Sequence, residues 1–176
     1  MGANHSEVVY PSQTMQVPQV EDSQCVGPRK LYIKHKWNTR KEKIEISDEA
    51  GNVRWFSEDH SGAFKRELHV LDPVHHKLWA ILRHQLSIHW AYDVEFEGHT
   101  YKLVKKFLGD YELEGTGWKC VKKFLGNEVE LTDGAGVIML MTRHFGSDKE
   151  LSIFRHDLEV PAICLAMIVD IEDRSH

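Results

Sequence analysis

Residues 160–169, with the sequence VPAICLAMIV, are apolar on every face of the helix that they are expected to form. A helix without a polar side must be surrounded by protein or by lipid. Ten residues rise only about 15 Å, which is roughly half the hydrocarbon thickness of a bilayer. We therefore predict a helix enclosed by the rest of the domain, with Glu159 favouring its N-terminus. The polar residues 170–176 that follow are expected to return to water.

The preceding 120 or so residues alternate between apolar and polar side chains, as strands do. In residues 31–37, Leu31 and Ile33 fall on one face, while Lys34 and Lys36 fall on the other. Turns rich in Gly, Asp, Asn and Pro separate about twelve such segments, and VKKFLG occurs twice, at 104–109 and 121–126. Closing the sheet into a barrel removes exposed strand edges. A barrel of about twelve strands has room inside for the apolar helix at 160–169. The predicted fold is mainly β, a closed barrel of about twelve antiparallel strands around a central hydrophobic C-terminal helix.

The domain organisation and the compartment follow from length and composition. Residues 1–28 contain three prolines and show no periodicity, so we expect a disordered N-terminal tail, with one barrel domain at 29–176. The net charge of −5 argues against a general nucleic-acid binder. Three widely spaced cysteines suggest neither a disulfide framework nor a zinc site, and no secretion signal or spanning segment is visible. A cytoplasmic location is expected. Peripheral attachment to the cytoplasmic face of a membrane is compatible with it.

Three segments, 31–37 (LYIKHKW), 46–53 (ISDEAGNV) and 162–170 (AICLAMIVD), resemble the LURP-one-related family. This family belongs to the tubby C-terminal-like superfamily, to which phospholipid scramblases are related. The resemblance covers about residues 30–172 and implies a twelve-stranded barrel around a central C-terminal helix. About function the resemblance implies less: among the relatives, tubby proteins bind phosphoinositides through basic residues of the barrel, and scramblases act on phospholipids at membranes. The chain lacks the cysteine cluster of scramblases, and residues 147–159 do not match a calcium-binding loop. We therefore do not expect calcium-dependent scrambling from the resemblance.

The candidate site is a run of basic residues at the start of the barrel, interrupted by the single acid Glu42. Each basic group near an anionic leaflet contributes about 1 kcal/mol to binding. The alternative interpretation is a solvated charge run that protects a sheet edge. The lipid-headgroup candidates are Arg29, Lys30, Lys34, Lys36, Arg40, Lys41 and Lys43. The lysines at 105–106 and 122–123 are weaker candidates, because acidic residues follow both pairs and a mixed-charge surface is expected there.

A second membrane signal lies at the N-terminus, where Gly2 and Ser6 fit the myristoylation pattern. The alternative is a plain tail. One myristoyl chain binds membranes only marginally, near 10⁴ M⁻¹, so it needs a second signal such as the basic run.

No linear motif of catalysis or metal binding is present. The twelve histidines form no HExxH pattern, and GxSxG and phosphate-loop motifs are missing, so we expect neither enzyme activity nor a cofactor or metal. Cys164 falls within the apolar run and is expected to be inert core.

The preferred hypothesis is a non-enzymatic, peripheral-membrane module that recognises anionic phospholipid headgroups. The first alternative is a protein-interaction or regulatory scaffold with a stable protein partner, and the second is a scramblase-like activity, which comes from the family relationship alone.

Overall fold

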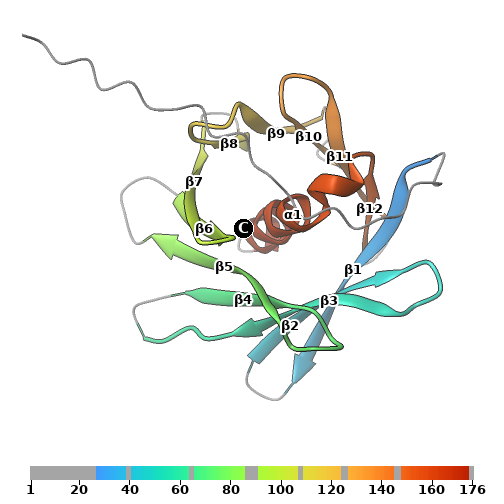
Figure 1. The fold of residues 1–176 in the computed structure, drawn as a ribbon, viewed down its shortest axis with the longest axis vertical. Coiled ribbons are helices and arrows are strands. Elements are labelled where there is room, and N and C mark those ends of the chain that lie inside the picture. The colour runs from blue at the N-terminus through green and yellow to red at the C-terminus, as the bar shows by residue number, and fades with distance from the viewer. Residues whose placement is uncertain are drawn as a thin grey trace, which may run out of the picture.

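The fold is a closed barrel of twelve antiparallel strands that encircles one helix (Figure 1). The structure, a computed structural model, describes residues 27–38, 41–63, 66–85, 91–106, 109–123, 127–144 and 148–174. Every strand pairs with its neighbours in sequence, and β1 pairs with β12 to close the barrel. The predicted fold class is confirmed.

The strands are joined mostly by tight turns, as the spacing of turn residues predicts. Their bounds are β1 Arg29–Asn38, β2 Lys41–Asp48, β3 Val53–Asp59, β4 Glu67–Leu71, β5 Leu78–Gln85, β6 Ala91–Phe96, β7 His99–Lys105, β8 Tyr111–Leu113, β9 Trp118–Lys122, β10 Glu128–Thr132, β11 Val137–Arg143 and β12 Lys149–Ile153. A short 3₁₀ helix, η2 at His156–Leu158, leads into the helix α1 at Glu159–Arg174.

Alternation places the apolar side chains of the strands inside the barrel, around α1. Leu31 and Ile33 of β1 are fully buried, whereas Lys34 and Lys36 are exposed, as predicted from the period of two. The inward side chains and the helix form one hydrophobic cluster, in which Cys164 and Met167 have no exposed surface. Burial raises the pKa of the Cys164 thiol to about 12, consistent with an inert core position.

The helix is longer than the apolar run, and its polar end does not return to water as the sequence analysis expected. Asp170 and Glu172 are 0% and 2% exposed, and Ile171 lies beside them in the core. The expectation is wrong because these carboxylates meet basic and phenolic groups from the strands, as described below. Among the described residues, no helix is long and apolar enough to cross a bilayer.

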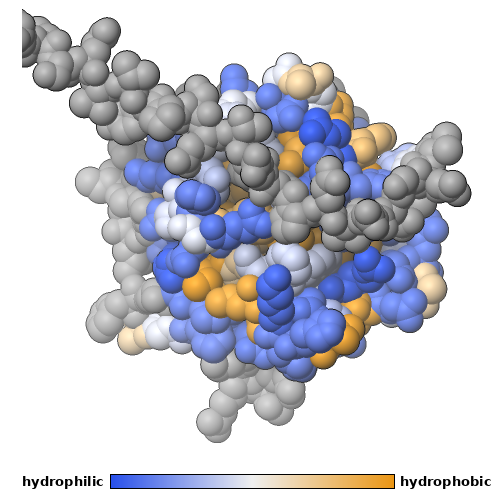
Figure 2. Space-filling model, viewed as in Figure 1, coloured by the Kyte–Doolittle hydropathy of each residue, from blue (hydrophilic) through white to orange (hydrophobic). Residues whose placement is uncertain are grey.

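The outer surface is mostly hydrophilic on the face shown in Figure 2, where apolar side chains form separate spots. Four large apolar side chains are exposed in the described part of the chain: Val74, Leu78, Val137 and Phe154. All four lie on the rim that surrounds the N-terminus of α1: Val74 is in the turn between β4 and β5, and the others are at the starts of β5 and β11 and directly after β12.

Candidate functional site

The basic run folds into the first hairpin, and its lysines lie on the outer face of β1 and β2. In the register of these two strands, Lys34 lies opposite Glu45, and Lys36 lies opposite Lys43. Because side chains opposite each other point to the same face, three lysines surround one carboxylate. The Lys36 ammonium lies 2.6 Å from Glu45 Oε2, and the Lys43 ammonium lies 3.2 Å from Oε1.

Glu45 is the acidic centre of this lysine group. Partial burial opposes ionisation of its carboxyl, but hydrogen bonds from Lys36 and Lys43 outweigh it and lower the pKa. Glu45 is therefore ionised at neutral pH and neutralises part of the lysine charge. Lys34 is exposed, and no described carboxylate lies within ion-pair distance of it. The group keeps a net positive charge.

The neighbouring strands extend the positive face. Lys30 of β1 pairs with Glu150 of β12 at 3.0 Å, and Arg54 of β3 is exposed. The Lys43 ammonium also lies 4.3 Å from the centroid of the Phe56 ring, which fixes the direction of its side chain. We use the name basic face for the exposed outer side of the adjacent strands β12, β1, β2 and β3, with its described cations Lys30, Lys34, Lys36, Lys43 and Arg54 and its carboxylates Glu45, Glu58 and Glu150.

Arg29 differs from the lysines of the run because it turns toward the helix. Its guanidinium donates a hydrogen bond of 2.6 Å to Glu159 at the N-terminus of α1. The indole N–H of Trp55 donates to the other oxygen of the same carboxylate at 3.1 Å. Arg29 thus anchors the helix, a role that the linear charge run did not indicate.

The side chains of three predicted site residues are not described by the structure. Gly2 and Arg40 lie outside the described residues. Lys41 is the first residue of β2, and only its backbone is described. The weaker candidates Lys106 and Lys123 pair with Glu112 and Glu130 at 3.5 and 3.0 Å, which confirms the expected mixed-charge surface.

A second polar group, inside the barrel, was not predicted from the sequence. Asp170 of α1 accepts a hydrogen bond from His35 of β1, and the Lys149 ammonium lies 2.8 Å from its other oxygen. The side chains of His35, Lys149 and Asp170 are 2%, 4% and 0% exposed. Burial opposes ionisation of Asp170, but the His35 hydrogen bond and the Lys149 charge lower its pKa to about 2.

Asp173, one turn further along α1, extends this buried polar group. The Lys122 ammonium lies 2.6 Å from one of its oxygens, and the Lys149 ammonium lies 3.0 Å from the other. Glu172 accepts a hydrogen bond of 2.7 Å from the hydroxyl of Tyr92. Strands β1, β6, β9 and β12 therefore hold the C-terminal end of the helix. These contacts tie the end of the helix to the wall of the barrel.

The histidines do not assemble with other ligands in the described residues. His60 and His69 stack with ring centroids 3.9 Å apart, and Glu67 accepts a hydrogen bond from His69. No group of three or more His, Cys, Asp or Glu side chains in the described ranges is arranged to hold a metal ion.

Comparisons with known proteins support the fold. No family model matches the chain, and no curated protein matches it. The X-ray structure of a protein from Arabidopsis thaliana is similar, with 14% identity and a TM-score of 0.58, over 85% of this chain and 94% of that one. At this identity the similarity concerns the architecture alone, and the LURP-one-related family remains a resemblance.

Proposed function

We propose that this chain is a non-enzymatic barrel module of the LURP-one-related type that binds anionic phospholipid headgroups through the basic face. The observation that supports it is charge asymmetry. A chain with a net charge of −5 presents, among its described residues, five exposed or half-exposed cations and three carboxylates on the outer side of four adjacent strands. The rest of the molecule is correspondingly more acidic, so the basic face would orient the barrel on an anionic surface.

The expected affinity is modest. Each lysine near an anionic leaflet contributes about 1 kcal/mol, and the internal pairs with Glu45 and Glu150 reduce that contribution. A surface attraction of this size holds a protein at a membrane only together with a second signal. An acyl chain on Gly2 is the second signal that we propose, with the cytoplasmic leaflet as the membrane surface.

The test is sedimentation with liposomes, using unacylated protein so that the basic face acts alone. We expect binding to vesicles of phosphatidylcholine with phosphatidylserine, little binding to phosphatidylcholine alone, and a decrease as salt rises. The variant K34E/K36E should lose most of this binding. The matched control is K102E/K119E, which reverses two exposed lysines on the outer faces of β7 and β9.

Equal binding to neutral and acidic vesicles, or an equal loss in the two variants, would refute the assignment to the basic face. Intact-mass analysis of protein from cells tests the acyl chain separately, because retention of Met1 excludes myristoylation of Gly2.

A further inference from the structure

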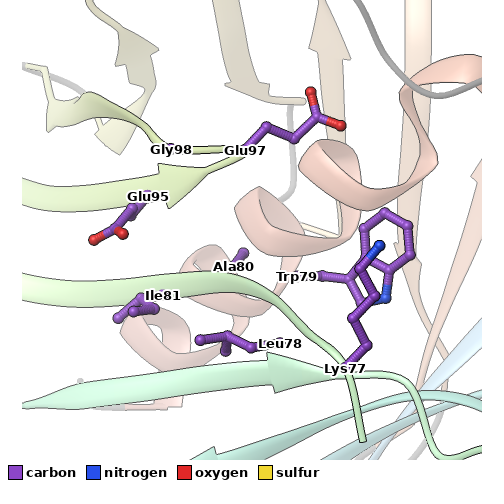
Figure 3. Close-up of a pocket in the computed structure, with 8 residues that line it drawn as sticks. All are labelled: Lys77, Leu78, Trp79, Ala80, Ile81, Glu95, Glu97 and Gly98. Carbon is purple, nitrogen blue, oxygen red and sulfur yellow. The ribbon is translucent and has the colours of Figure 1, made fainter. Parts of the chain in front are cut away.

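A hollow of about 290 Å³ lies at the rim of the barrel, where β5 begins and the hairpin of β6 and β7 turns (Figure 3). Its lining residues come from β5 and the residue before it, from β6 and from the turn between β6 and β7, and none of them belongs to the basic face. Eight residues line it: Lys77, Leu78, Trp79, Ala80, Ile81, Glu95, Glu97 and Gly98.

The hollow exists because two adjacent hairpins diverge. Pairing of β5 with β6 starts at Ala80 and Phe96, and the chain then reverses at Glu97 and Gly98. Of the first two residues of β5, Leu78 therefore pairs with β4 only, and Trp79 has a register partner in neither β4 nor β6. An open strand edge of this kind accepts an extended segment from another chain.

A bulge directs Trp79 into this rim. Opposite β4, Val70 pairs with Ala80 and Leu71 pairs with Leu78, so Trp79 is the extra residue. Bulges change the direction of side chains, and here Trp79 and Ala80 both point toward the helix, while Leu78 and Ile81 point away from it (Figure 3). The Trp79 ring then meets the Trp55 ring edge to face, with centroids 5.5 Å apart.

Backbone strain is concentrated at the same place. Among the described residues, only His76 and Glu97 have positive φ without being glycine, at 51° and 49°. His76 directly precedes the hollow and Glu97 lines it. Glu97 takes the first position of a two-residue hairpin turn, where Asn, Asp and Gly are favoured. Such outliers occur preferentially at functional sites, and this one holds a carboxylate at the edge of the hollow.

The chemistry of the hollow favours a cation. The Lys77 ammonium lies 4.0 Å from the centroid of the Trp79 ring, so one face of this ring already attracts a positive charge. Lys77 and Glu97 are exposed, and no ion pair of either with another described residue is present. A guanidinium is more weakly hydrated than an ammonium and stacks better on an aromatic face, so an arginine can replace Lys77.

We propose that this hollow binds an extended segment of a partner protein, with an arginine stacked on Trp79 and paired with Glu97. Lys77 occupies the ring face in the free protein and moves into solvent when the arginine binds. An apolar residue of the same segment packs on the outer side against Leu78, which is 45% exposed. The open strand edge and this apolar contact favour a peptide over a small cationic headgroup.

The probe is the peptide acetyl-Val-Leu-Arg-Val-Leu-amide, and its counterpart with citrulline in place of arginine is uncharged but nearly isosteric. The indole N–H signal of Trp79, assigned by its loss in W79F, is followed in two-dimensional NMR spectra during titration. The arginine peptide should shift this signal saturably and bind at least about three times more tightly than the citrulline peptide.

Three variants sharpen the test. E97Q should lower the affinity for the arginine peptide about two- to fivefold, which is the range expected for an exposed ion pair. K77Q should raise the affinity for this peptide, because the competing cation is removed. E114Q, which changes an exposed glutamate in another turn of the same rim, should leave it unchanged.

Equal affinity of the two peptides, the lack of a saturable shift at Trp79, or weaker binding to K77Q would overturn the proposal. Since the hollow and the basic face share no residue, lipid binding can fail or succeed independently of this result.

Discussion

Replacing Asp170 with Asn tests whether the buried polar group holds the helix in the barrel. The amide keeps the size of the side chain but removes the negative charge between His35 and Lys149, which are almost completely buried. Breaking a buried ion pair by removing one partner costs about 3–5 kcal/mol. In the variant, Lys149 still has Asp173 as an ion-pair partner at 3.0 Å. We therefore expect the free energy of unfolding to fall by about 3 kcal/mol, the lower end of that range.

The pH dependence of this loss follows from the pKa of Asp170, which is lowered from 3.8 to about 2 in the folded protein. A carboxyl with a lowered folded pKa stabilises the protein above its unfolded pKa, and this contribution is lost as pH falls toward the folded pKa. A shift of this size corresponds to about 2.5 kcal/mol, of which about 1 kcal/mol is already lost at pH 3. The difference in stability between wild type and D170N should therefore shrink by about 1 kcal/mol between pH 7 and pH 3.

Urea denaturation followed by circular dichroism measures this difference at the two pH values. The control E128Q makes the same chemical change at an exposed carboxylate, and we expect it to stay within about 0.5 kcal/mol of wild type. A loss below about 1 kcal/mol for D170N at pH 7, or a difference that does not change with pH, would refute the role of Asp170.

Four further predictions concern the core, the basic face, a turn and a thiol. L165A should lower the free energy of unfolding by about 2–5 kcal/mol in urea denaturation, because Leu165 is 1% exposed within the barrel. E45Q should bind acidic liposomes about two- to fivefold more tightly than wild type in sedimentation, since it frees two lysines from an internal ion pair. G98A should destabilise the barrel by about 1 kcal/mol in thermal unfolding, since φ is +76° there although the space is open. Cys164 should react with Ellman's reagent only after unfolding, because burial raises its pKa to about 12.

The strands and the enclosure of the helix could be predicted because each depends on local periodicity. Leu31 and Ile33 alternate with Lys34 and Lys36, and this pattern alone gives the inner and outer faces of β1. The run 160–169 likewise has no polar face, so it had to be enclosed.

The end of the helix could not be predicted, because its stability depends on contacts between distant residues. His35 and Asp170 are 135 positions apart, and a carboxylate at the end of an apolar run usually indicates solvent. Only the closed barrel brings His35 and Lys149 to the same carboxylate. Arg29 was assigned to the lipid candidates for the same reason, since a linear charge run does not reveal its partner Glu159.

The hollow beside Trp79 was also invisible in the sequence. A bulge adds one residue to one strand of a pair, and the alternation of LWAIL at 78–82 does not indicate which residue is extra. The register with β4 identifies Trp79.

The most direct measurement of membrane contact at the basic face is paramagnetic relaxation enhancement in the presence of phosphatidylserine nanodiscs that contain a gadolinium-labelled lipid. We expect the amide signals near Lys34, Lys36 and Lys43 to broaden first, while those near Lys102 and Lys119 remain sharp. Stronger broadening at β7 and β9 than at β1 and β2 would contradict this expectation.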